Sequence, residues 1–547
     1  MKNIIYVAVC FFCLCTFISV SSFAQQADLI LTNGKIFTSD SKQPYVQALA
    51  IKGNKILASG SNLAIEKLAS PKTRWIDLEG KLVVPGFNDA HDHPGWEAQI
   101  GKSYSYTEMD HVGLSKAAVL DSIGTLVKEA RPGEWIHGLI GIAVLHDSSM
   151  RASLDSLAPN NPVALQIWWG HGLTVNGKAL EASGLRDSDK EPVGGWFIRN
   201  ADNKISSLEQ NAQAPIWIAR YKSDPENLIK GLQSYAHKQL QGGITTVQYM
   251  GTGFNAKDAD NILPAANLPQ RIRMIAFPRS TSAGRQLSDW NTKSKSPSSL
   301  TYLTGIKYVI DGSPMGENSL RTIPYPGKPG WYGRFNYPID TMKQIFREAL
   351  TTDRQLLMHI TADSSFAVIL SLMKEMATAQ QWKTKRVRIE HNCVGDISIQ
   401  QRKDLREMGI IMMHTAFYCM ASPLRSLLED GVLLGVSPDG TTNPLIEIMM
   451  MTSTHSNPKE NLTREEAVIA YTKTNAYAEF KENEKGTLTK GMLADLAVLS
   501  QDIFTIPANQ LTSTKSIMTI IDGKVVYEQS KDMSVKTETI LNTKTKH

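Results

Sequence analysis

The 547-residue sequence is poor in cysteine, and most of its five cysteines lie in one short segment. Cys10, Cys13 and Cys15 fall among the first twenty residues, which leaves only Cys393 and Cys419 in the rest of the chain. Two cysteines cannot supply the disulfide framework of a small secreted domain, so a hydrophobic core must stabilise the fold. One bridge between Cys393 and Cys419 has no support in the sequence, and we interpret both residues as buried thiols.

The sequence also lacks a strong bias of charge. Its 58 Lys and Arg residues against 53 Asp and Glu residues give a formal net charge of only +5. No dense basic run interleaved with aromatic residues is present, so nucleic acid is not an expected partner. The 42% hydrophobic and 20% charged residues are typical of a folded globular protein, whose length suggests a large barrel or several domains.

Long apolar runs are absent except near the start of the chain. Lys2 precedes the almost wholly apolar residues 4–20, and Ser22-Phe23-Ala24 places small residues where signal peptidase cleaves. This pattern predicts a signal peptide over residues 1–24 and an exported protein, periplasmic or secreted, without stable membrane insertion. A membrane anchor is the alternative, although the run is short for a spanning helix.

Both ends of the remaining chain have the pattern of short strands separated by glycine-containing turns. We therefore predict a composite β-sandwich built from residues 27–84 and 481–532, followed by a tail at 533–547. The predicted strands are 28–33, 35–38, 46–52, 55–58, 496–499, 516–521 and 524–527.

The middle of the chain alternates apolar strands with amphipathic helices, which predicts an α/β fold with a (β/α)₈ TIM barrel over residues 85–480. Roughly 140 residues separate the first two strands, far more than a connecting loop requires, so an inserted subdomain or lid is expected at about 96–235. The predicted strands are 81–87, 244–250, 271–277, 305–310, 355–360, 386–390, 409–413 and 433–436, and the helices are 341–350, 364–377, 399–408 and 464–480.

Metal-binding side chains follow several of these strands. His91 and His93 come after the first strand, and in extended backbone residues two apart point to the same side. His359 and His391 end the fifth and sixth strands, and Asp439 follows the eighth. A single histidine at a strand end is usually structural, but their joint placement predicts a cluster at one barrel mouth, where imidazole and carboxylate groups suit Zn²⁺.

Lys307 lies within the fourth strand and has two interpretations. A buried lysine beside cations tends to lose its proton, and a neutral amine can add CO₂ to form a carbamate that bridges two metals. A salt-bridged or exposed lysine is the alternative. The predicted cofactor is therefore one or two divalent metal ions, preferably Zn²⁺, with a carbamate on Lys307 as a hypothesis.

Several motifs occur in the order found in one known family. They are V-P-G-F-N-D-A-H-D-H at 84–93, G-I-K-Y-V-I-D-G-S at 305–313, H-I-T-A-D at 359–363, R-I-E-H at 388–391, and the segment 486–496. The chain resembles the amidohydrolase superfamily, specifically its family-3 branch of N-substituted formamide deformylase-like proteins. The resemblance implies His91, His93, His359 and His391 as metal ligands, Lys307 as a carboxylated bridge, and Asp439 as ligand and proton shuttle.

The resemblance extends to residues around this predicted centre. Gly170-His171 with Asn176 resembles a motif near the pocket, so His171 is a candidate catalytic contact to substrate or oxyanion, with a packing role as the alternative. We expect Glu390 and Asp363 to orient the ligands through hydrogen bonds. One departure is Ser437-Pro438-Asp439 in place of Gly-Ser-Asp, because Pro438 restricts the backbone beside the proton shuttle.

The favoured function is hydrolysis of a non-peptide C–N bond of amide type in a small molecule, by metal-activated water with Asp439 as proton shuttle. Fold alone does not fix the reaction. A metal-dependent decarboxylase, isomerase or C–O hydrolase on the same site is one alternative, and a non-catalytic exported binding protein is another. The expected partner is a small-molecule substrate, and self-association into a homo-oligomer stays open.

Overall fold

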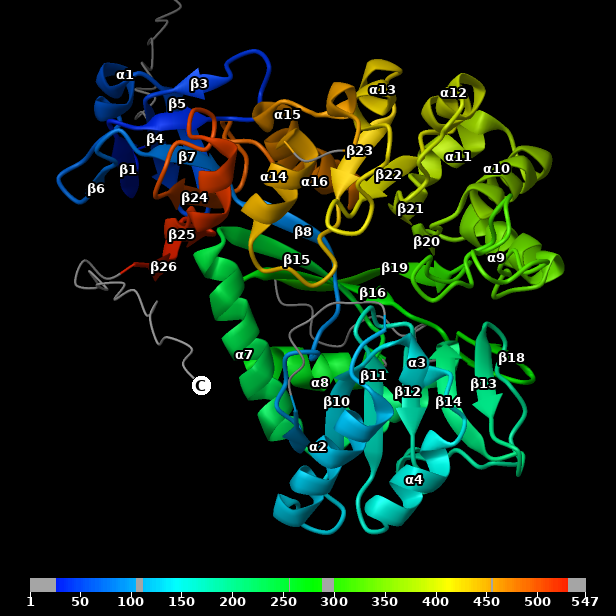
Figure 1. The fold of residues 1–547 in the computed structure, drawn as a ribbon. Helices are drawn as coiled ribbons and strands as arrows, with labels where there is room; N and C mark the ends of the chain where they lie inside the picture. Colours follow the sequence, from blue (N-terminus) through cyan, green and yellow to red (C-terminus); the bar gives the residue numbers. More distant parts are fainter. Residues whose placement is uncertain (1–25, 105–111, 255, 288–299, 454–455, 530–547) are drawn as a thin grey trace, which may run out of the picture.

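The computed structural model describes residues 26–104, 112–254, 256–287, 300–453 and 456–529. The predicted signal peptide at 1–24 and tail at 533–547 lie outside these residues. Figure 1 shows three parts: a sandwich built from the two ends of the chain, a barrel, and an insert that forms a separate lobe. Within the described residues, no helix has the length and apolar character needed to cross a membrane.

Both ends of the chain build the β-sandwich. The two ends meet where β7 pairs antiparallel with β24, with Val84 opposite Ala497. Leu31, Leu49 and Leu496 are buried in the core between the two sheets. One sheet has the order β5 (Lys55–Gly60), β4 (Ala48–Lys52), β1 (Leu29–Thr32), β6 (Arg74–Asp77). The other has the order β26 (Lys524–Glu528), β25 (Ser516–Ile521), β24 (Leu496–Leu499), β7 (Leu82–Pro85), β2 (Lys35–Phe37), β3 (Tyr45–Val46).

Eight parallel strands form the barrel sheet, as predicted. They are, in chain order, β8 (Phe87–Asp92), β15 (Ile244–Met250), β16 (Arg271–Ala276), β19 (Thr301–Val309), β20 (Leu356–His359), β21 (Arg388–His391), β22 (Ile411–His414) and β23 (Leu433–Val436).

The first predicted strand, residues 81–87, is wrong as a single element. Its residues divide between β7 in the sandwich and β8 in the barrel, with Gly86 at the crossing. A Cβ atom on Gly86 would lie 2.2 Å from Thr245 Oγ1, so only glycine fits where the chain passes between the two sheets.

A side chain closes the barrel between its first and last strands. The Asn475 carboxamide accepts a hydrogen bond from Val436 N at 3.1 Å and donates to the carbonyls of Asn88 and Val436 at 2.7 and 2.8 Å. Asn475 begins α16 directly after a π-helical turn at Ala470–Thr474. The predicted single helix at 464–480 is thus α15 (Arg464–Ile469), the π turn and α16 (Asn475–Ala478).

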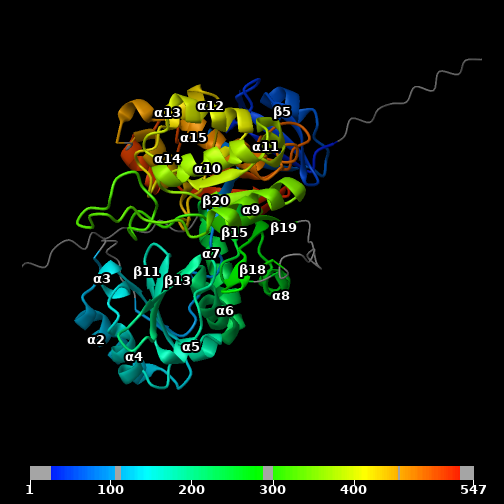
Figure 2. The same ribbon diagram turned by 90° about the vertical axis from the view of Figure 1, so that its right-hand side faces the viewer.

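Helices surround the barrel sheet (Figure 2). They are α7 (Pro225–Gln241), α8 (Ala256–Ala266), α9 (Ile339–Thr351), α10 (Asp363–Met376), α11 (Ala379–Lys385), α12 (Ile399–Met408), α13 (Leu424–Glu429) and α14 (Pro444–Ser453). A short hairpin, β17 (Arg279–Thr281) with β18 (Gly284–Gln286), follows β16.

The segment between β8 and β15 folds as a lobe with its own sheet and its own core around Ile123, Leu154 and Leu165. The sheet order is β13 (Gly195–Arg199), β14 (Ile205–Gln210), β12 (Gly172–Val175), β11 (Val163–Ile167), β10 (Ile136–Ile140), β9 (Lys102–Ser103). Its helices are α2 (Lys116–Glu129), α3 (Ile142–Leu145), α4 (Met150–Leu157), α5 (Gly177–Ser183), a 3₁₀ turn at Asn211–Gln213 and α6 (Ala214–Ser223).

The structure places the end of the insert before α7 rather than near residue 235. The carbonyl of Leu240 in α7 accepts a hydrogen bond of 2.8 Å from Thr519 Oγ1 in β25. Because α7 packs on the barrel and the sandwich, it serves as the barrel helix that precedes β15.

Candidate metal centre

Four imidazoles meet at the carboxyl ends of the barrel strands. His91 lies in β8 and His93 follows it, while His359 and His391 end β20 and β21. The ring centroids of His91 and His391 are 4.8 Å apart, those of His359 and His391 are 4.4 Å apart, and those of His91 and His93 are 5.4 Å apart. Parallel strands in a barrel end on one rim, and this brings together residues 300 positions apart.

Asp439 completes the cluster from the eighth strand. Its Oδ1 is 3.3 Å from His93 Nε2 and 3.8 Å from His91 Nε2, and its Oδ2 is 3.8 Å from His391 Nδ1. The Asp439 backbone has a φ of 54°, and its amide donates to the His91 carbonyl at 3.0 Å. The Ser437-Pro438-Asp439 sequence therefore still directs the carboxylate at the histidines.

The protonation state of these groups suits metal binding. Burial lowers the pKa of His91 to about 4 and holds the pKa values of His359 and His391 well below their usual range. Burial alone would raise the pKa of Asp439, but His91 and His93 keep it well below its ordinary value. Neutral imidazoles and an ionised carboxylate are the forms that bind divalent metals.

Lys307 in β19 lines the same cavity as the histidines. The residue is 2% exposed, and its Nζ has no hydrogen-bond partner among the described residues. Burial lowers its pKa to about 8, against the opposing effect of Glu390 and Asp439. An amine with this pKa is partly neutral near pH 8, which is the form that can take up CO₂.

Glu390 contacts one of the four imidazoles, that of His91. Its Oε2 is 2.7 Å from His91 Nδ1, which leaves Nε2 of His91 facing the cluster. Arg388 donates to Glu390 at 2.7 and 3.0 Å, to Gln248 Oε1 at 2.6 Å and to the Ala90 carbonyl at 2.7 Å. Glu390 and Arg388 have no exposed surface, so the imidazole rests on a buried ion pair.

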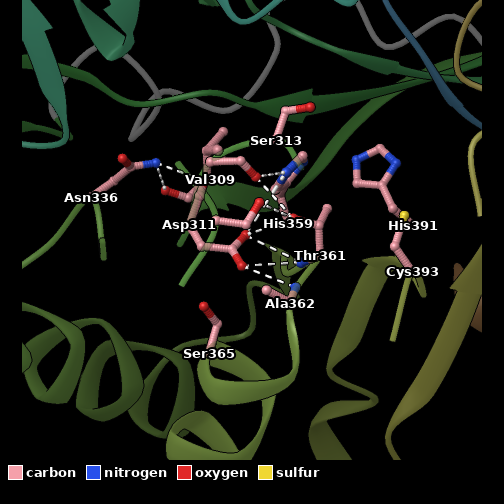
Figure 3. A network of polar contacts seen from close by, with 12 residues as sticks. Val309, Asp311, Ser313, Asn336, His359, Thr361, Ala362, Ser365, His391 and Cys393 are labelled. Atoms are coloured by element: carbon pink, nitrogen blue, oxygen red, sulfur yellow. Dashed lines mark hydrogen bonds and ion pairs between the residues drawn. The ribbon is translucent and has the colours of Figure 1, made fainter. Parts of the chain in front are cut away.

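The second expected orienting residue, Asp363, lies elsewhere. Its half-buried carboxylate accepts hydrogen bonds from Thr322 N at 3.0 Å and from the Thr322 hydroxyl, at the start of α10. Asp311 lies beside His359 instead, with its Oδ1 3.9 Å from His359 Nε2. The Asp311 carboxylate accepts from the amides of Thr361 and Ala362 at 3.2 Å (Figure 3).

His359 is further fixed by the Gly312 carbonyl, which accepts a hydrogen bond from Nε2 at 3.0 Å and leaves Nδ1 for the cluster. Sequence reasoning missed Asp311, although it stands one residue beyond a buried strand run in the 305–313 motif. Asp92, between the two histidines of the first motif, points away and accepts from Gln239 Nε2 at 2.8 Å.

The insert contributes His171 to the site. The residue lies between β11 and β12, and its ring centroid is 4.7 Å from that of His359. Its Nδ1 is 2.9 Å from Gln210 Oε1, at the end of β14. A residue from a separate lobe thus faces the barrel rim across the cavity.

Two adjoining cavities open from the cluster, and both are lined by Trp169, His171, His359, His391 and Asp439. The smaller, of about 60 Å³, reaches the insert and Trp96, whose ring stacks on His93 at 4.4 Å. The larger, of about 210 Å³, is bounded on its apolar side by Met315, Tyr418 and Met420.

Cys393 and Cys419 also line the larger cavity and form a disulfide, so our interpretation of them as free buried thiols is wrong. They follow His391 in β21 and His414 in β22, whose carboxyl ends are adjacent because the two strands pair in parallel. The bridge therefore ties together two loops of the cavity wall.

The described residues fit a divalent metal. Ligand atoms of His91, His391 and Asp439 all lie within 4.8 Å of one another. Asp439 Oδ1 and Lys307 Nζ are buried without hydrogen-bond partners in the part of the chain that the structure describes. Buried polar atoms are normally paired, so a cluster of ligand atoms with two orphans is the arrangement expected where a cation completes the site.

Fold and site together define a (β/α)₈ barrel protein with a histidine-rich cluster on the carboxyl rim that fits a divalent metal. Residues 74–527 match the family model described as "Amidohydrolase family", and the chain belongs to this family.

Relatives match over most of the chain. "Protein LONG AFTER FAR-RED 3" of Arabidopsis thaliana is 27% identical, over 92% of this chain and 92% of the relative. "N-substituted formamide deformylase" of Arthrobacter pascens is 25% identical, over 92% of this chain and 99% of that protein. An uncharacterized metal-dependent hydrolase from Pyrococcus furiosus shares the fold with a TM-score of 0.64 at 19% identity, covering 87% of this chain and 100% of that one.

Proposed function

We propose that this chain is an exported hydrolase that cleaves a non-peptide C–N bond of amide type in a small molecule. One observation carries the proposal. Asp439 Oδ1 is buried without a hydrogen-bond partner among the described residues and lies 3.3 Å from His93 Nε2, where two cavities meet. The name of the formamide deformylase relative supports a C–N bond as the target.

In this proposal, His91, His93, His359, His391 and Asp439 hold one or two divalent ions. Imidazole and carboxylate ligands favour Zn²⁺. When bound, such an ion lowers the pKa of a water to about 7 and polarises a carbonyl group. A carbamate on Lys307, formed from its neutral amine and CO₂ with release of a proton, would supply one further carboxylate ligand.

In this proposal, Asp439 transfers the proton of the reaction and His171 contacts the substrate. Asp439 accepts a proton from the attacking water and delivers it to the leaving nitrogen as the C–N bond breaks, which gives a carboxylic acid and an amine. His171 faces the cluster from the insert. Gln210 Oε1 accepts a hydrogen bond from His171 Nδ1, so Nε2 of the neutral ring is left to accept from an N–H group of the substrate.

Export remains part of the proposal through the signal peptide expected at residues 1–24. The Cys393–Cys419 disulfide supports it, because disulfides persist in oxidising compartments and are rare in the cytosol.

The test is release of amine from a panel of N-acyl amino acids and N-acyl amines, with and without a chelator. Asp439→Asn should lower kcat by about 10²- to 10⁴-fold. Asp363→Asn, which alters a half-buried carboxylate at the start of α10, is the matched control and should leave the rate unchanged.

Release of CO₂ or rearrangement of a substrate without hydrolysis would favour the decarboxylase or isomerase alternative. A folded, metal-loaded protein inert across broad hydrolase panels would favour a binding protein. Metal analysis with mass spectrometry under non-acidic conditions tests Lys307, and one metal with an unmodified lysine would end the carbamate hypothesis.

A further inference from the structure

The wall of the smaller cavity that faces the cluster carries three carboxamides from one short segment of the insert. Gln210, Asn211 and Gln213 stand at the end of β14 and in the 3₁₀ turn that follows, and all three line the cavity. Their exposed fractions are 6%, 5% and 6%. We call these three residues the carboxamide subsite.

Each carboxamide has one polar atom engaged and one without a hydrogen-bond partner among the described residues. Gln210 uses Oε1 toward His171, Asn211 uses Nδ2 toward Tyr337 Oη at 2.7 Å, and Gln213 uses Nε2 toward the Gln210 carbonyl at 3.3 Å. The remaining atoms, Gln210 Nε2, Asn211 Oδ1 and Gln213 Oε1, are buried and unpaired. Rotating an amide exchanges its oxygen and nitrogen but still leaves one polar atom unpaired.

Three such orphans in one cavity wall are unusual, because an unpaired buried polar atom carries the full penalty of its desolvation. The backbone at Gln210 adds strain, with a φ of 54° and a ψ of −131° in a region that residues other than glycine rarely occupy. Strained residues with unpaired polar groups gather where a ligand completes the hydrogen bonding. Gln210 also contacts His171, so the subsite adjoins the proposed reaction centre.

We infer that the carboxamide subsite binds an uncharged substrate group that carries both N–H donors and a C=O acceptor, such as an amide, urea or lactam. Orphan oxygens accept from the N–H groups, and an orphan amide nitrogen donates to the carbonyl. Among the described residues that line this cavity, the charged ones are Lys307 and Asp439, and both come from the barrel side. The described part of the insert therefore offers no counter-ion to an ionised group.

Size limits the group as well. One water molecule needs about 10–15 Å³ of cavity volume, so the smaller cavity of about 60 Å³ has room for roughly four to six waters. This volume suits a substrate group of a few heavy atoms. A larger apolar substituent would extend into the 210 Å³ cavity beside Met315, Tyr418 and Met420.

The inference rests on the proposed function for its setting, but its test needs no turnover. The probes are acetamide and acetone, which have the same number of heavy atoms and the same carbonyl and differ only in NH₂ against CH₃. Binding to the metal-loaded protein is measured by ligand-observed NMR. Acetamide should bind at least about tenfold more tightly than acetone, and Gln210→Met and Gln213→Met should each weaken acetamide by about 3- to 10-fold.

Gln270→Met is the matched control. Gln270 is fully buried, donates Nε2 to the Ala236 carbonyl at 2.7 Å and also has an unpaired Oε1, but it does not line the cavity. Acetamide affinity should be unchanged in this variant. Metal content and unfolding midpoints establish that each variant is folded.

Equal binding of acetamide and acetone to the wild-type protein would overturn the inference, and this comparison needs no variant. Wild-type acetamide affinity in both Gln210→Met and Gln213→Met would also overturn it. If acetamide binds as expected while no amide is hydrolysed, the proposed function fails and the carboxamide subsite stands. If amides are hydrolysed and neither substitution alters acetamide binding or KM, the subsite fails alone.

Discussion

Replacing Glu390 by glutamine tests whether the buried ion pair beneath His91 supports both the fold and the metal centre. Glu390 lies between Arg388, at 2.7 and 3.0 Å, and His91 Nδ1, at 2.7 Å. The glutamine keeps the size of the side chain and removes the charge. Arg388 then stays buried with neutral partners only, close to Lys307, whose positive charge Glu390 otherwise balances.

The expected effects follow from complete burial. Both Glu390 and Arg388 are 0% exposed, and removing one partner of such a pair costs about 3–5 kcal/mol in the free energy of unfolding. His91 also loses the carboxylate that fixes its Nδ1, and loss of such an orienting group weakens metal affinity by about 10- to 100-fold. Burial would raise the pKa of Glu390, but Arg388 and Lys307 hold it well below its usual value. The wild-type pair therefore stabilises the fold above the unfolded pKa of about 4.3 and loses this effect as pH falls.

The assay is urea unfolding followed by circular dichroism, together with metal titration of the folded protein. Glu375→Gln is the control, because Glu375 pairs with Lys343 at 2.8 Å but is 62% exposed, and such pairs contribute about 0–1 kcal/mol. If Glu390→Gln unfolds at the same urea concentration as the wild type and binds metal as tightly, the reasoning about this buried pair is refuted.

Three further predictions concern residues around the site. Burial raises the pKa of Glu447, which accepts from Ala416 N at 2.7 Å, to about 8, so the folded state binds its proton more tightly than the unfolded state. The free energy of unfolding of the wild type should fall as pH rises from about 4.5 to 8. In Glu447→Gln, the difference between the urea midpoints at pH 5.5 and pH 8.5 should be smaller than in the wild type. An equal difference in the two proteins would contradict this prediction. Asn475→Leu removes the three hydrogen bonds that link the Asn475 carboxamide to the first and last barrel strands. It should lower the free energy of unfolding, measured by urea unfolding, by about 3 kcal/mol or more. A loss under about 1 kcal/mol would contradict the proposal that Asn475 closes the barrel. A chain that begins at residue 25, and so lacks Cys10, Cys13 and Cys15, should show no reactive thiol with a thiol reagent. Reduction of Cys393–Cys419, 26 residues apart, should destabilise it by about 2–4 kcal/mol, and two titratable thiols before reduction would contradict the bridge.

Much of the fold can be predicted from local patterns of apolar and turn residues in the sequence. Seven of the eight predicted barrel strands overlap the barrel strands from β15 to β23. A short apolar run bounded by turn residues indicates a buried strand, and this signal lies within the segment itself. The first strand fails because residues 82–92 are continuously buried, and only Gly86 marks the passage from β7 to β8. The closing contact from Asn475 also has no local signal, since an asparagine within a helical pattern usually faces solvent.

The sequence by itself determined which imidazoles could meet. Parallel strands in a barrel end on one rim, so the placement of His91, His93, His359 and His391 at strand ends implies one cluster from the sequence pattern alone. Only the tertiary structure decided which groups surround that cluster. It selected Asp311 rather than Asp363 beside His359, paired Cys393 with Cys419, and brought Gln210 of the insert to His171. These contacts depend on the paths of loops and on how the insert docks against the barrel. Long-range packing determines both, whereas local periodicity is enough to determine the strands.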